Sequence, residues 1–352
     1  MKTIQVNVSK TYEVKIGRNI LNEVTSTLKV GQKLAIVTDE TVAMLHLEKL
    51  KSVLENAGFE PEVFMFPSGE ASKSVKVLSC LLEWLASVQM TRSDVILAFG
   101  GGVTGDLAGF AASIYLRGIE FIQIPTTFLA AIDSSVGGKT GIDLEAGKNL
   151  AGSFWQPQAV ICDISLLETL PEEVFAEGSA EAIKVGILRD AEMFEIIKAG
   201  EIRQRLDEII YRCVSIKRDI VERDEFDTGE RQLLNLGHTF GHCIEKLSNF
   251  EVTHGNAVAT GLALIMKAAV IYGHCTKEEK DIVIRTLYEN GLYTDCPYKA
   301  DEMMEVMKRD KKRQGDKLTI ILPRKIGECF LHTLTLEEAR EYLQSGIDGG
   351  KA

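Results

Sequence analysis

The first half of the chain alternates short apolar runs with longer amphipathic stretches. The apolar runs have strand length and predict buried strands at 33–39, 61–66, 94–102, 121–127 and 159–165. Helical periodicity marks the intervening stretches 41–57 and 73–90, and residues 1–17 alternate as a pair of strands does. Because strands that alternate with helices form mostly parallel sheets covered on both faces, this half predicts an α/β domain.

After residue 168 the pattern becomes helical. Pro171 followed by acidic residues is a helix-start signature. Helical periodicity then predicts helices at 191–199, 201–224, 231–248, 254–272, 277–290 and 300–310, a hairpin from 317–323 and 327–334, and a last helix at 335–345. We therefore predict an α/β domain over 1–168 and a mainly helical domain over 169–352, with a cleft between them as the default site.

Composition narrows the class of protein without identifying a function. The 352 residues suffice for two domains, and 45% hydrophobic with 26% charged residues is ordinary for a globular enzyme. The net charge of −11 argues against non-specific nucleic-acid binding. Seven cysteines without CxxC spacing predict reduced thiols in the cytoplasm. We expect neither a signal peptide nor an apolar run of membrane-spanning length.

A glycine-rich segment follows the predicted strand 94–102 and opens into a helix. Gly100, Gly102 and Gly105 match the GxGxxG pattern, in which glycines let the backbone approach a phosphate at a helix N-terminus. The segment does not follow the first strand, and no ribose-binding acid stands about twenty residues further on. The pattern therefore indicates a phosphate-binding turn of unusual type, and the alternative is a tight strand-helix turn.

Residues 125–149 form a polar run rich in Gly, Ser and Thr. Such segments, here with Lys139 and Lys148, suit an anionic ligand with several hydroxyl groups. A long surface loop without a ligand explains the same composition.

Two of the six histidines stand four apart in the predicted helix 231–248. At 3.6 residues per turn, Arg231, Asn235, His238 and His242 lie within an arc of about 60°, which predicts a narrow polar stripe. Imidazoles at this spacing favour metal or proton chemistry, although two buried, hydrogen-bonded histidines would show the same spacing.

A possible carboxylate partner for these imidazoles lies in the segment GSAEAIKVG. Glu181 and Lys184 are three apart on one helix face, and alone they indicate an ordinary ion pair. Together with His238 and His254, however, Glu181 would complete a plausible Zn²⁺ site that leaves a position for substrate.

Further cations are scattered along the chain. Arg117, Lys217 and Arg231 are candidates for binding anions, and a run between 308 and 313 predicts a loop before a strand. In an acidic protein most of these side chains are expected on the solvated surface, Arg309 and Arg313 among them. A loop of this kind can also close on an anionic substrate.

The motifs in their order resemble those of the 3-dehydroquinate synthase family. They are SGEASK, GGGVTGDLAGF, RGI, PTT, DSSVGGKTG, KNLAGSF, TLP, GSAEAIK, LLNLGHTFGH, THGNAVATG and RDKK, and they extend from residue 68 to 312. The resemblance implies an N-terminal α/β nucleotide-binding domain with a mostly parallel sheet and a mainly α-helical C-terminal domain, in a cytoplasmic homodimer. It also implies NAD and Zn²⁺ or Co²⁺ as cofactors. The implied reaction converts 3-deoxy-D-arabino-heptulosonate 7-phosphate to 3-dehydroquinate and phosphate.

The resemblance further implies roles for residues that match the family motifs. The implied metal ligands are Glu181, His238 and His254. The implied NAD contacts are Asp39, Glu70, Lys73, Gly101, Gly102, Val103, Thr104, Gly105, Asp106, Thr126, Thr127, Asp133, Ser134, Lys139, Lys148, Thr169 and Leu170. The implied substrate and catalytic groups are Arg117, Lys139, Asn149, Lys184, Lys217, Arg231, Asn235, His242 and Lys311. Arg117 is expected to reach across a dimer interface, and Lys312 competes with Lys311 for its role.

Two departures from the family pattern concern fine positioning. Asp227 stands where the family more often has Glu, and Thr41 stands where Asn is common.

Competing functions are a cyclase that makes an inosose or a valiolone from another sugar phosphate, a metal-dependent polyol dehydrogenase, and a non-catalytic interaction protein. Gly138, Lys139 and Asn235 favour a carboxylate-bearing substrate over the other cyclases, and Glu181 argues against the dehydrogenase, whose family typically has Asp as the acidic ligand.

Overall fold

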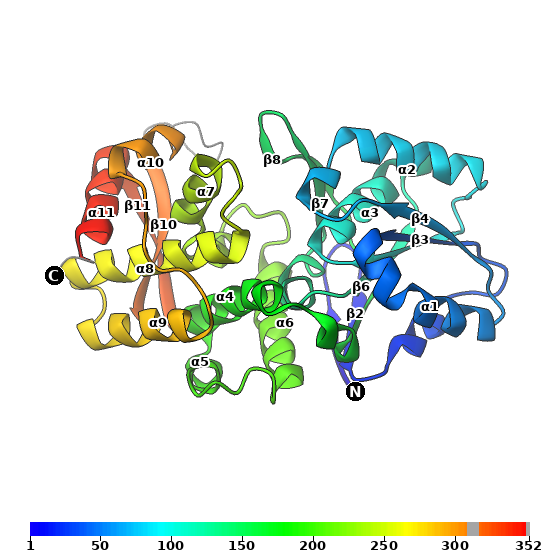
Figure 1. The fold of residues 1–352 in the computed structure, drawn as a ribbon, viewed down its shortest axis with the longest axis horizontal. Helices are drawn as coiled ribbons and strands as arrows, with labels where there is room; N and C mark the ends of the chain where they lie inside the picture. Colours follow the sequence, from blue (N-terminus) through cyan, green and yellow to red (C-terminus); the bar gives the residue numbers. More distant parts are fainter. Residues whose placement is uncertain (308–316, 350–352) are drawn as a thin grey trace. The chain divides into compact units, whose positions relative to one another are not determined.

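The computed structural model describes residues 1–307 and 317–349 (Figure 1). The chain divides into two compact units. The first comprises Met1–Pro171 with Ile210–Phe226, and the second comprises Glu172–Ile209 with Asp227–Ala352. The cationic run with Lys308, Arg309, Lys311, Lys312 and Arg313 lies outside the described residues.

A seven-stranded sheet forms the first unit, in the order β1-β2-β9-β6-β5-β3-β4. All neighbouring strands are parallel except β1 and β2. The strands are β1 (Lys2–Val6), β2 (Tyr12–Gly17), β3 (Leu34–Asp39), β4 (Pro61–Phe66), β5 (Val95–Gly100), β6 (Glu120–Pro125) and β9 (Ala159–Asp163). The mostly parallel sheet predicted from the apolar runs is confirmed.

Burial on both faces of the sheet explains why its central strands are apolar throughout. Along β5 alternate residues belong to two hydrophobic clusters: Val95, Leu97 and Phe99 to one, Ile96 and Ala98 to the other. The first cluster includes side chains of α1 (Glu40–Asn56), and the second includes side chains of α2 (Val75–Ser87) and α3 (Gly102–Ile114). Since helices cover each face, a strand gains by being apolar at every position.

The polar run 125–149 is not the long loop that its composition suggested. A π-helical turn at Ala130–Ser134 follows β6, and then β7 (Lys139–Leu144) pairs with β8 (Gly147–Phe154) as an antiparallel hairpin. Gly141 and Gly152 face each other in this hairpin, where a Cβ at Gly152 would lie 2.1 Å from the carbonyl oxygen of Thr140. The glycines that suggested a loop therefore serve close strand pairing.

Helices make up most of the second unit, with one hairpin beside them (Figure 1). The elements are α4 (Glu172–Arg189), α5 (Ala191–Lys198), α6 (Leu206–Arg223, shared with the first unit), α7 (His238–Leu247), α8 (His254–Ile271), α9 (Lys277–Glu289), α10 (Ala300–Met307), β10 (Lys317–Lys325), β11 (Glu328–Thr335) and α11 (Leu336–Asp348). Helix α8 packs against α4, α7, α9 and α11. Within the described residues the predicted hairpin and helices are confirmed, apart from one corrected below, although the helix predicted from 201 begins only at Leu206.

The central helix α8 corrects the expectation that no apolar run reaches membrane-spanning length. Its 18 residues have a mean hydropathy of 1.3, which suffices by length and composition to cross a membrane. However, 72% of this stretch is buried inside the protein. Packing against four neighbouring helices explains its composition without a membrane.

The prediction of one continuous helix over 231–248 is wrong, because the helix is interrupted at Gly237. Glu230–Asn235 forms a 3₁₀ helix, Gly237 adopts a left-handed conformation with φ 79°, and α7 begins only at His238. A Cβ at Gly237 would lie 2.9 Å from Cγ of Leu262, and one at Gly261 would lie 2.1 Å from the Gly237 carbonyl oxygen. Close approach to α8 therefore requires the break, and the single stripe from Arg231 to His242 does not exist.

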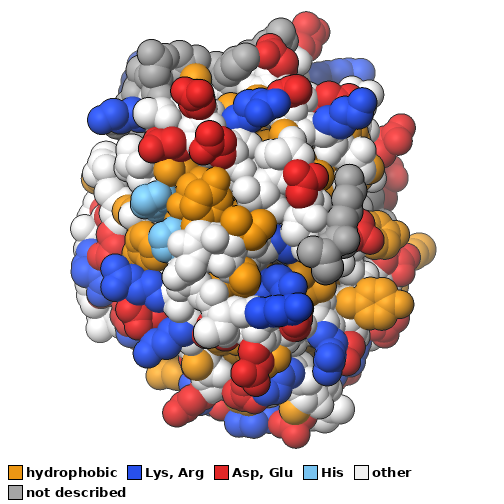
Figure 2. All heavy atoms as spheres, turned by 90° about the vertical axis from the view of Figure 1, so that its left-hand side faces the viewer, with side chains coloured by type: hydrophobic (Ala, Val, Ile, Leu, Met, Phe, Trp, Pro, Cys, Tyr) orange, Lys and Arg blue, Asp and Glu red, His pale blue; other side chains and the backbone are white. Residues whose placement is uncertain are grey.

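Three histidines outside the predicted ligand set have partners of their own. His274 is hydrogen bonded to Oη of Tyr342 at 3.0 Å, and its ring also contacts those of Phe330 and His332. Figure 2 shows histidine and hydrophobic side chains side by side on the face that it presents. His46 is hydrogen bonded to Oγ1 of Thr169 at 2.9 Å. These three side chains therefore have packing and hydrogen-bonding roles.

Candidate functional site

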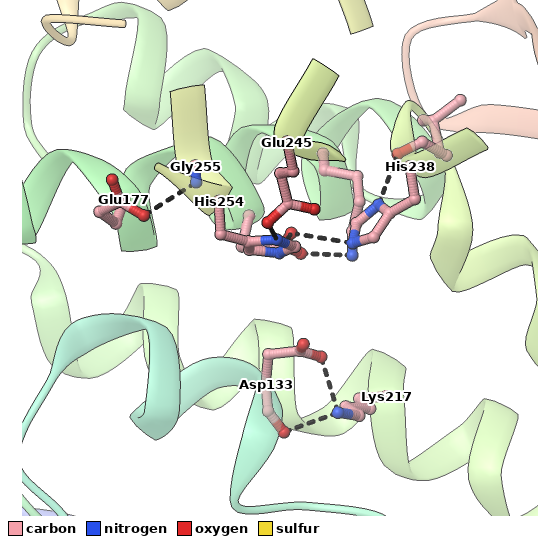
Figure 3. Close-up of polar contacts among 10 residues, drawn as sticks. Asp133, Glu177, Lys217, His238, Glu245, His254 and Gly255 are labelled. Atoms are coloured by element: carbon pink, nitrogen blue, oxygen red, sulfur yellow. Dashed lines mark hydrogen bonds and ion pairs between the residues drawn. The ribbon is translucent and has the colours of Figure 1, made fainter. Parts of the chain in front are cut away.

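Three helices of the second unit bring one carboxylate and two imidazoles together. Glu181 lies within α4, whereas His238 and His254 are the first residues of α7 and α8. Nε2 of His238 and Nε2 of His254 each lie 3.3 Å from the same oxygen, Oε1 of Glu181 (Figure 3). Helix starts suit this role, because a side chain in the first turn projects beyond the packed part of the helix.

The donor atoms fit a divalent metal ion. Zn²⁺ binds imidazole nitrogen and carboxylate oxygen at about 2.0–2.2 Å, so two ligands of a tetrahedral site lie about 3.4 Å apart. Among the described residues, Glu181, His238 and His254 form a group whose ligand atoms lie within 4.8 Å of one another. Both Glu181 oxygens are buried, and Oε1, which faces the two imidazoles, accepts no hydrogen bond of good geometry from the described part of the chain. An acceptor left in this state is what a bound cation would satisfy.

Charge around Glu181 keeps its carboxylate ionised. Burial alone would raise the pKa of Glu181, but the ammonium group of Lys184 and the two imidazoles hold it well below its usual value. Lys184 forms an ion pair with Oε2 of Glu181, and both side chains are almost fully buried. The ion pair expected from the spacing is therefore present in the interior, where its charges are weakly screened.

The two imidazoles differ in charge before any metal binds. The pKa of His238 lies well below its usual value, mainly because the ring is buried, so this ring is neutral. Burial acts in the same direction on His254, but its close contacts with the carboxylates of Glu181 and Glu245 outweigh burial and raise its pKa to about 10. A bound cation would therefore displace a proton from His254.

The second nitrogen of each imidazole also has an acceptor. Nδ1 of His238 lies 3.2 Å from the carbonyl oxygen of Leu236, and Nδ1 of His254 lies 3.4 Å from Oε1 of Glu245. Sequence reasoning missed Glu245, although it stands seven residues after His238 and so on the same face of α7. It also missed Glu177, whose Oε2 accepts a hydrogen bond of 2.8 Å from the amide of Gly255 (Figure 3).

In the first unit, the glycine-rich turn joins β5 to α3. A Cβ at Gly100 would lie 2.2 Å from Oγ1 of Thr104, and one at Gly105 would lie 2.6 Å from Oε1 of Gln123. These glycines serve the tight turn itself. At Gly102 the nearest atom would be Oγ of Ser134 at 3.2 Å. Because Gly101 caps α3 without any side-chain hydrogen bond, the first amides of this helix are available to an anion.

A buried lysine connects the glycine-rich helix to the β7–β8 hairpin. Nζ of Lys73 lies 2.6 Å from Oδ2 of Asp106 and donates a hydrogen bond to the side chain of Asn149. Burial acts to lower the pKa of Lys73, but Asp106 and Glu70 outweigh it and raise the pKa. The other oxygen, Oδ1 of Asp106, is buried without a hydrogen bond in the described structure. The cluster thus presents a fixed cation and an unsatisfied acceptor.

A second lysine belongs to the same unit although it lies on α6. Nζ of Lys217 donates to the carbonyl oxygen and to Oδ1 of Asp133, both at 2.6 Å (Figure 3). The two residues are 84 positions apart in sequence. The fold therefore supplies a pairing that no local pattern indicated.

Family comparisons agree along almost the whole chain. Residues 63–177 match the family model described as 3-dehydroquinate synthase N-terminal, and residues 178–313 match the one described as 3-dehydroquinate synthase C-terminal. The 3-dehydroquinate synthase of Clostridium perfringens is 44% identical over 96% of this chain and 99% of its own. The chain belongs to the 3-dehydroquinate synthase family.

Solved structures of related cyclases share this fold. A 2-deoxy-scyllo-inosose synthase complexed with carbaglucose-6-phosphate, NAD⁺ and Co²⁺ matches with a TM-score of 0.87 and 25% identity, over 98% of this chain and 100% of that one. A 2-epi-5-epi-valiolone synthase from Streptomyces hygroscopicus with NAD⁺ and Zn²⁺ bound has a TM-score of 0.89 and 26% identity, over 98% and 99%. The predicted α/β and helical organisation is thereby confirmed.

In this family member, most predicted NAD contacts follow the carboxyl ends of parallel strands. Asp39 ends β3, Glu70 follows β4, Gly101 follows β5, Thr126 follows β6 and Thr169 follows β9. Val103, Thr104 and Gly105 lie on α3, and Lys148 lies on β8. Thr127 and Leu170 lie in loops, and Ser134 ends the π-helical turn. Carboxyl ends of parallel strands meet at one edge of a sheet, where α/β proteins bind nucleotides.

Asp39 has a structural function at this edge. Its Oδ1 caps α1 by accepting from the amides of Thr41 and Val42, at 3.0 and 3.1 Å, and from Oγ of Ser68 at 2.8 Å. The hydroxyl of Thr41, one of the two departures from the family pattern, is hydrogen bonded to that of Ser68 at 2.8 Å. The threonine therefore supports the carboxylate beside it.

The predicted substrate groups fall into two sets. Arg117, Lys139, Asn149 and Lys217 belong to the first unit, while Lys184, Arg231, Asn235 and His242 belong to the second. In the second, His242 lies one turn after His238 on α7, with ring centroids 5.3 Å apart, and Arg231 is almost fully buried. In the first, Arg117 is exposed in a turn with φ 68°. Lys311 lies outside the described residues.

Proposed function

We propose that this protein is a 3-dehydroquinate synthase, a carbon–oxygen lyase that uses NAD and Zn²⁺ or Co²⁺. It converts 3-deoxy-D-arabino-heptulosonate 7-phosphate to 3-dehydroquinate and phosphate. The observation that carries the proposal is the cluster of Glu181, His238 and His254, with ligand atoms at metal-site spacing and Lys184 beside it, in a chain of this family. The related cyclases solved with NAD⁺ and Co²⁺ or Zn²⁺ support both cofactors.

The two cofactors and the chain divide the chemistry between them. When bound, NAD takes up and returns a hydride, and the cation polarises neighbouring substrate hydroxyls as a Lewis acid. The chain's own cations hold the phosphate and the carboxylate of the substrate: Lys139, Lys184, Lys217, Arg231 and Lys311 (or Lys312), with Asn149, Asn235 and Arg117 as further polar contacts. Holding one flexible substrate through successive steps is the main contribution of these groups.

His242 is our candidate for proton transfer or for orienting the departing phosphate. It lies on α7 with its ring centroid 6.5 Å from that of His254, so it stands beside the metal ligands without being grouped among them. Elimination of phosphate requires removal of a proton next to a carbonyl group, and an imidazole or the substrate phosphate can accept it.

NAD binding is proposed at the carboxyl edge of the parallel sheet. The missing side chain at Gly102, where a Cβ would meet the Ser134 hydroxyl at 3.2 Å, and the amides of the first turn of α3 suit the pyrophosphate. Asp39, Glu70, Lys73, Gly101, Val103, Thr104, Gly105, Asp106, Thr126, Thr127, Asp133, Ser134, Lys139, Lys148, Thr169 and Leu170 complete the proposed contacts. A functional boundary at residue 168, a homodimer and a cytoplasmic location accompany the proposal.

The alternative is a cyclase for another sugar phosphate, which the fold alone permits. It is less favoured because the inosose and valiolone synthases are 25% and 26% identical to this chain, against 44% for the 3-dehydroquinate synthase of Clostridium perfringens.

Phosphate release by metal-stripped protein tests the proposed function. NAD and Zn²⁺ are added separately and then together to 3-deoxy-D-arabino-heptulosonate 7-phosphate, while NADH absorbance is followed. We expect phosphate release only with both cofactors, no accumulation of NADH, and dehydroquinate as product. Absence of phosphate release with both would overturn the substrate assignment. Steady NADH accumulation with a polyol would indicate a dehydrogenase.

A further inference from the structure

The two histidines of the metal cluster are held by different kinds of acceptor. Nδ1 of His238 faces the backbone carbonyl of Leu236, which is two residues away and is positioned by the local backbone conformation. Nδ1 of His254 faces a side chain on another helix, the carboxylate of Glu245 on α7. Only the second acceptor can be removed by a substitution without rebuilding the backbone.

Glu245 is almost fully buried, which is unusual for a glutamate that has no specific partner. Its side chain is 5% exposed, and an ionised carboxylate in such surroundings is unfavourable unless charged or polar groups compensate it. His254 supplies one such group, at 3.4 Å from Oε1. Because Glu245 stands two turns after His238, helix α7 contributes one metal ligand directly and reaches the other through this carboxylate.

Contact with Glu245 determines which nitrogen of His254 is left for a cation. Once a cation has displaced its second proton, an imidazole that donates its Nδ1 proton to a carboxylate has a lone pair on Nε2, and its ring cannot rotate without losing that contact. Nε2 of His254 is the atom that lies 3.3 Å from Oε1 of Glu181. A carboxylate acceptor also makes Nε2 a better electron donor to a metal than a carbonyl acceptor does.

A second carboxylate holds the backbone of the same segment. Oε2 of Glu177 accepts from the amide of Gly255 at 2.8 Å, and Glu177 lies one turn before Glu181 on α4. A Cβ at Gly255 would lie 2.5 Å from Cα of Glu177, so the two helices are in close contact here. The start of α8 is thus fixed to the helix that carries the third ligand.

We propose that Glu245 is a positioning residue that holds His254 with Nε2 directed at the divalent cation. The inference deepens the proposed function, since it rests on the same cluster. It predicts that Glu245 controls metal affinity through His254 without touching the metal or the substrate.

Metal affinity of Glu245 variants tests the inference independently of catalysis. In Glu245→Ala we expect Zn²⁺ affinity, measured by chelator competition, to fall about 10- to 100-fold, and the visible spectrum of the Co²⁺-loaded protein to change. Glu245→Gln keeps a neutral oxygen acceptor of the same size, so its loss should be smaller. Glu251→Gln, which changes an exposed carboxylate just after α7, is the matched control and should bind Zn²⁺ as the wild type does.

Outcomes distinguish positioning from a general effect on stability. Unfolding of the metal-free proteins identifies a variant that is merely less stable, and Glu245→Gln replaces Glu245→Ala if the latter does not fold. Zn²⁺ affinity within about twofold of wild type in both variants, with an unchanged Co²⁺ spectrum, would overturn the inference. Failure of the proposed function would instead appear as a wild-type protein that binds Zn²⁺ normally but releases no phosphate.

Discussion

The proposed metal cluster and the glycine-rich turn would bind their ligands in opposite ways. At the proposed metal cluster, the side chains of Glu181, His238 and His254 would supply the donor atoms. At the turn, backbone amides are available because side chains are missing, as at Gly102. The comparison teaches that the first region is sensitive to removal of polar atoms and the second to addition of carbon atoms.

Removal of the shared carboxylate should have the largest effect. Glu181→Ala leaves two imidazoles without their common partner, so we expect loss of bound metal and a decrease in phosphate release of about a thousandfold or more. Because Lys184 remains buried without this carboxylate, the metal-free protein should also lose about 3–5 kcal/mol of unfolding free energy. Elemental analysis and chemical unfolding measure the two effects.

NAD titration provides the control for that variant. Binding of NAD should be retained in Glu181→Ala, since the proposed dinucleotide residues lie in the first unit. Metal content at the wild-type level would refute the ligand assignment.

Two alanine substitutions at the turn should separate packing from ligand approach. In Gly100→Ala the new Cβ would lie 2.6 Å from Cβ of Thr104, a clash that no side-chain rotation relieves, so stability should fall by about 1–3 kcal/mol or more. In Gly102→Ala the nearest atom is Oγ of Ser134 at 3.2 Å, and this hydroxyl can rotate away, so stability should be nearly unchanged while NAD affinity falls. Chemical unfolding and NAD titration decide, and equal NAD affinity in Gly102→Ala and wild type would count against the proposed pyrophosphate position.

Gly255→Ala reverses the comparison, because here an added carbon should impair the metal cluster. Its Cβ would lie 2.5 Å from Cα of Glu177, so α8 must move away from α4 and carry His254 with it. We expect Zn²⁺ affinity to fall about tenfold, together with a loss of stability of about 1–3 kcal/mol or more, as at Gly100. Unaltered affinity would show that the cluster tolerates displacement of this helix. Chelator competition and chemical unfolding are the measurements.

The smallest effect is expected at an ion pair on α1, outside both regions. Lys51 and Glu55 are partly exposed, one turn apart, with 3.9 Å between Nζ and Oε1. Lys51→Ala should change the free energy of unfolding by at most about 0.5 kcal/mol and leave metal and NAD affinity unaltered. A measurable change in metal or NAD affinity would mean that the metal cluster and the glycine-rich turn also respond to substitutions far from them.

The local sequence pattern was sufficient to predict elements whose side chains are determined by burial and capping within the same element. The strands of the parallel sheet were predictable because residues such as Val95, Leu97 and Phe99 are buried on one face while their neighbours are buried on the other. Capping boxes at Thr276 and Thr335 likewise begin α9 and α11 within a turn of the predicted helix starts.

Long-range contact decided the features that were predicted wrongly or missed. The polar stripe through Arg231 and His238 failed because Gly237 adopts φ 79° to approach α8, and periodicity does not register that approach. The hairpin at residues 139–154 was missed because glycines signal loops and close strand pairs alike. The contact of Glu177 with Gly255 and that of Lys217 with Asp133 were missed because each joins segments that are far apart in the chain.

By itself the sequence predicted the alternating architecture, the family, and a candidate ligand set of one carboxylate and two imidazoles. The architecture follows from residue type and spacing, which act over one or two turns of chain, whereas the family and the ligand set follow from the resemblance of the ordered motifs to a known family. Only the tertiary structure decided that both Nε2 atoms meet one oxygen of Glu181 at 3.3 Å and that Glu245 lies behind His254. The physical reason is that three separate helices must pack to within hydrogen-bonding distance, and that packing depends on contacts between residues far apart in the chain.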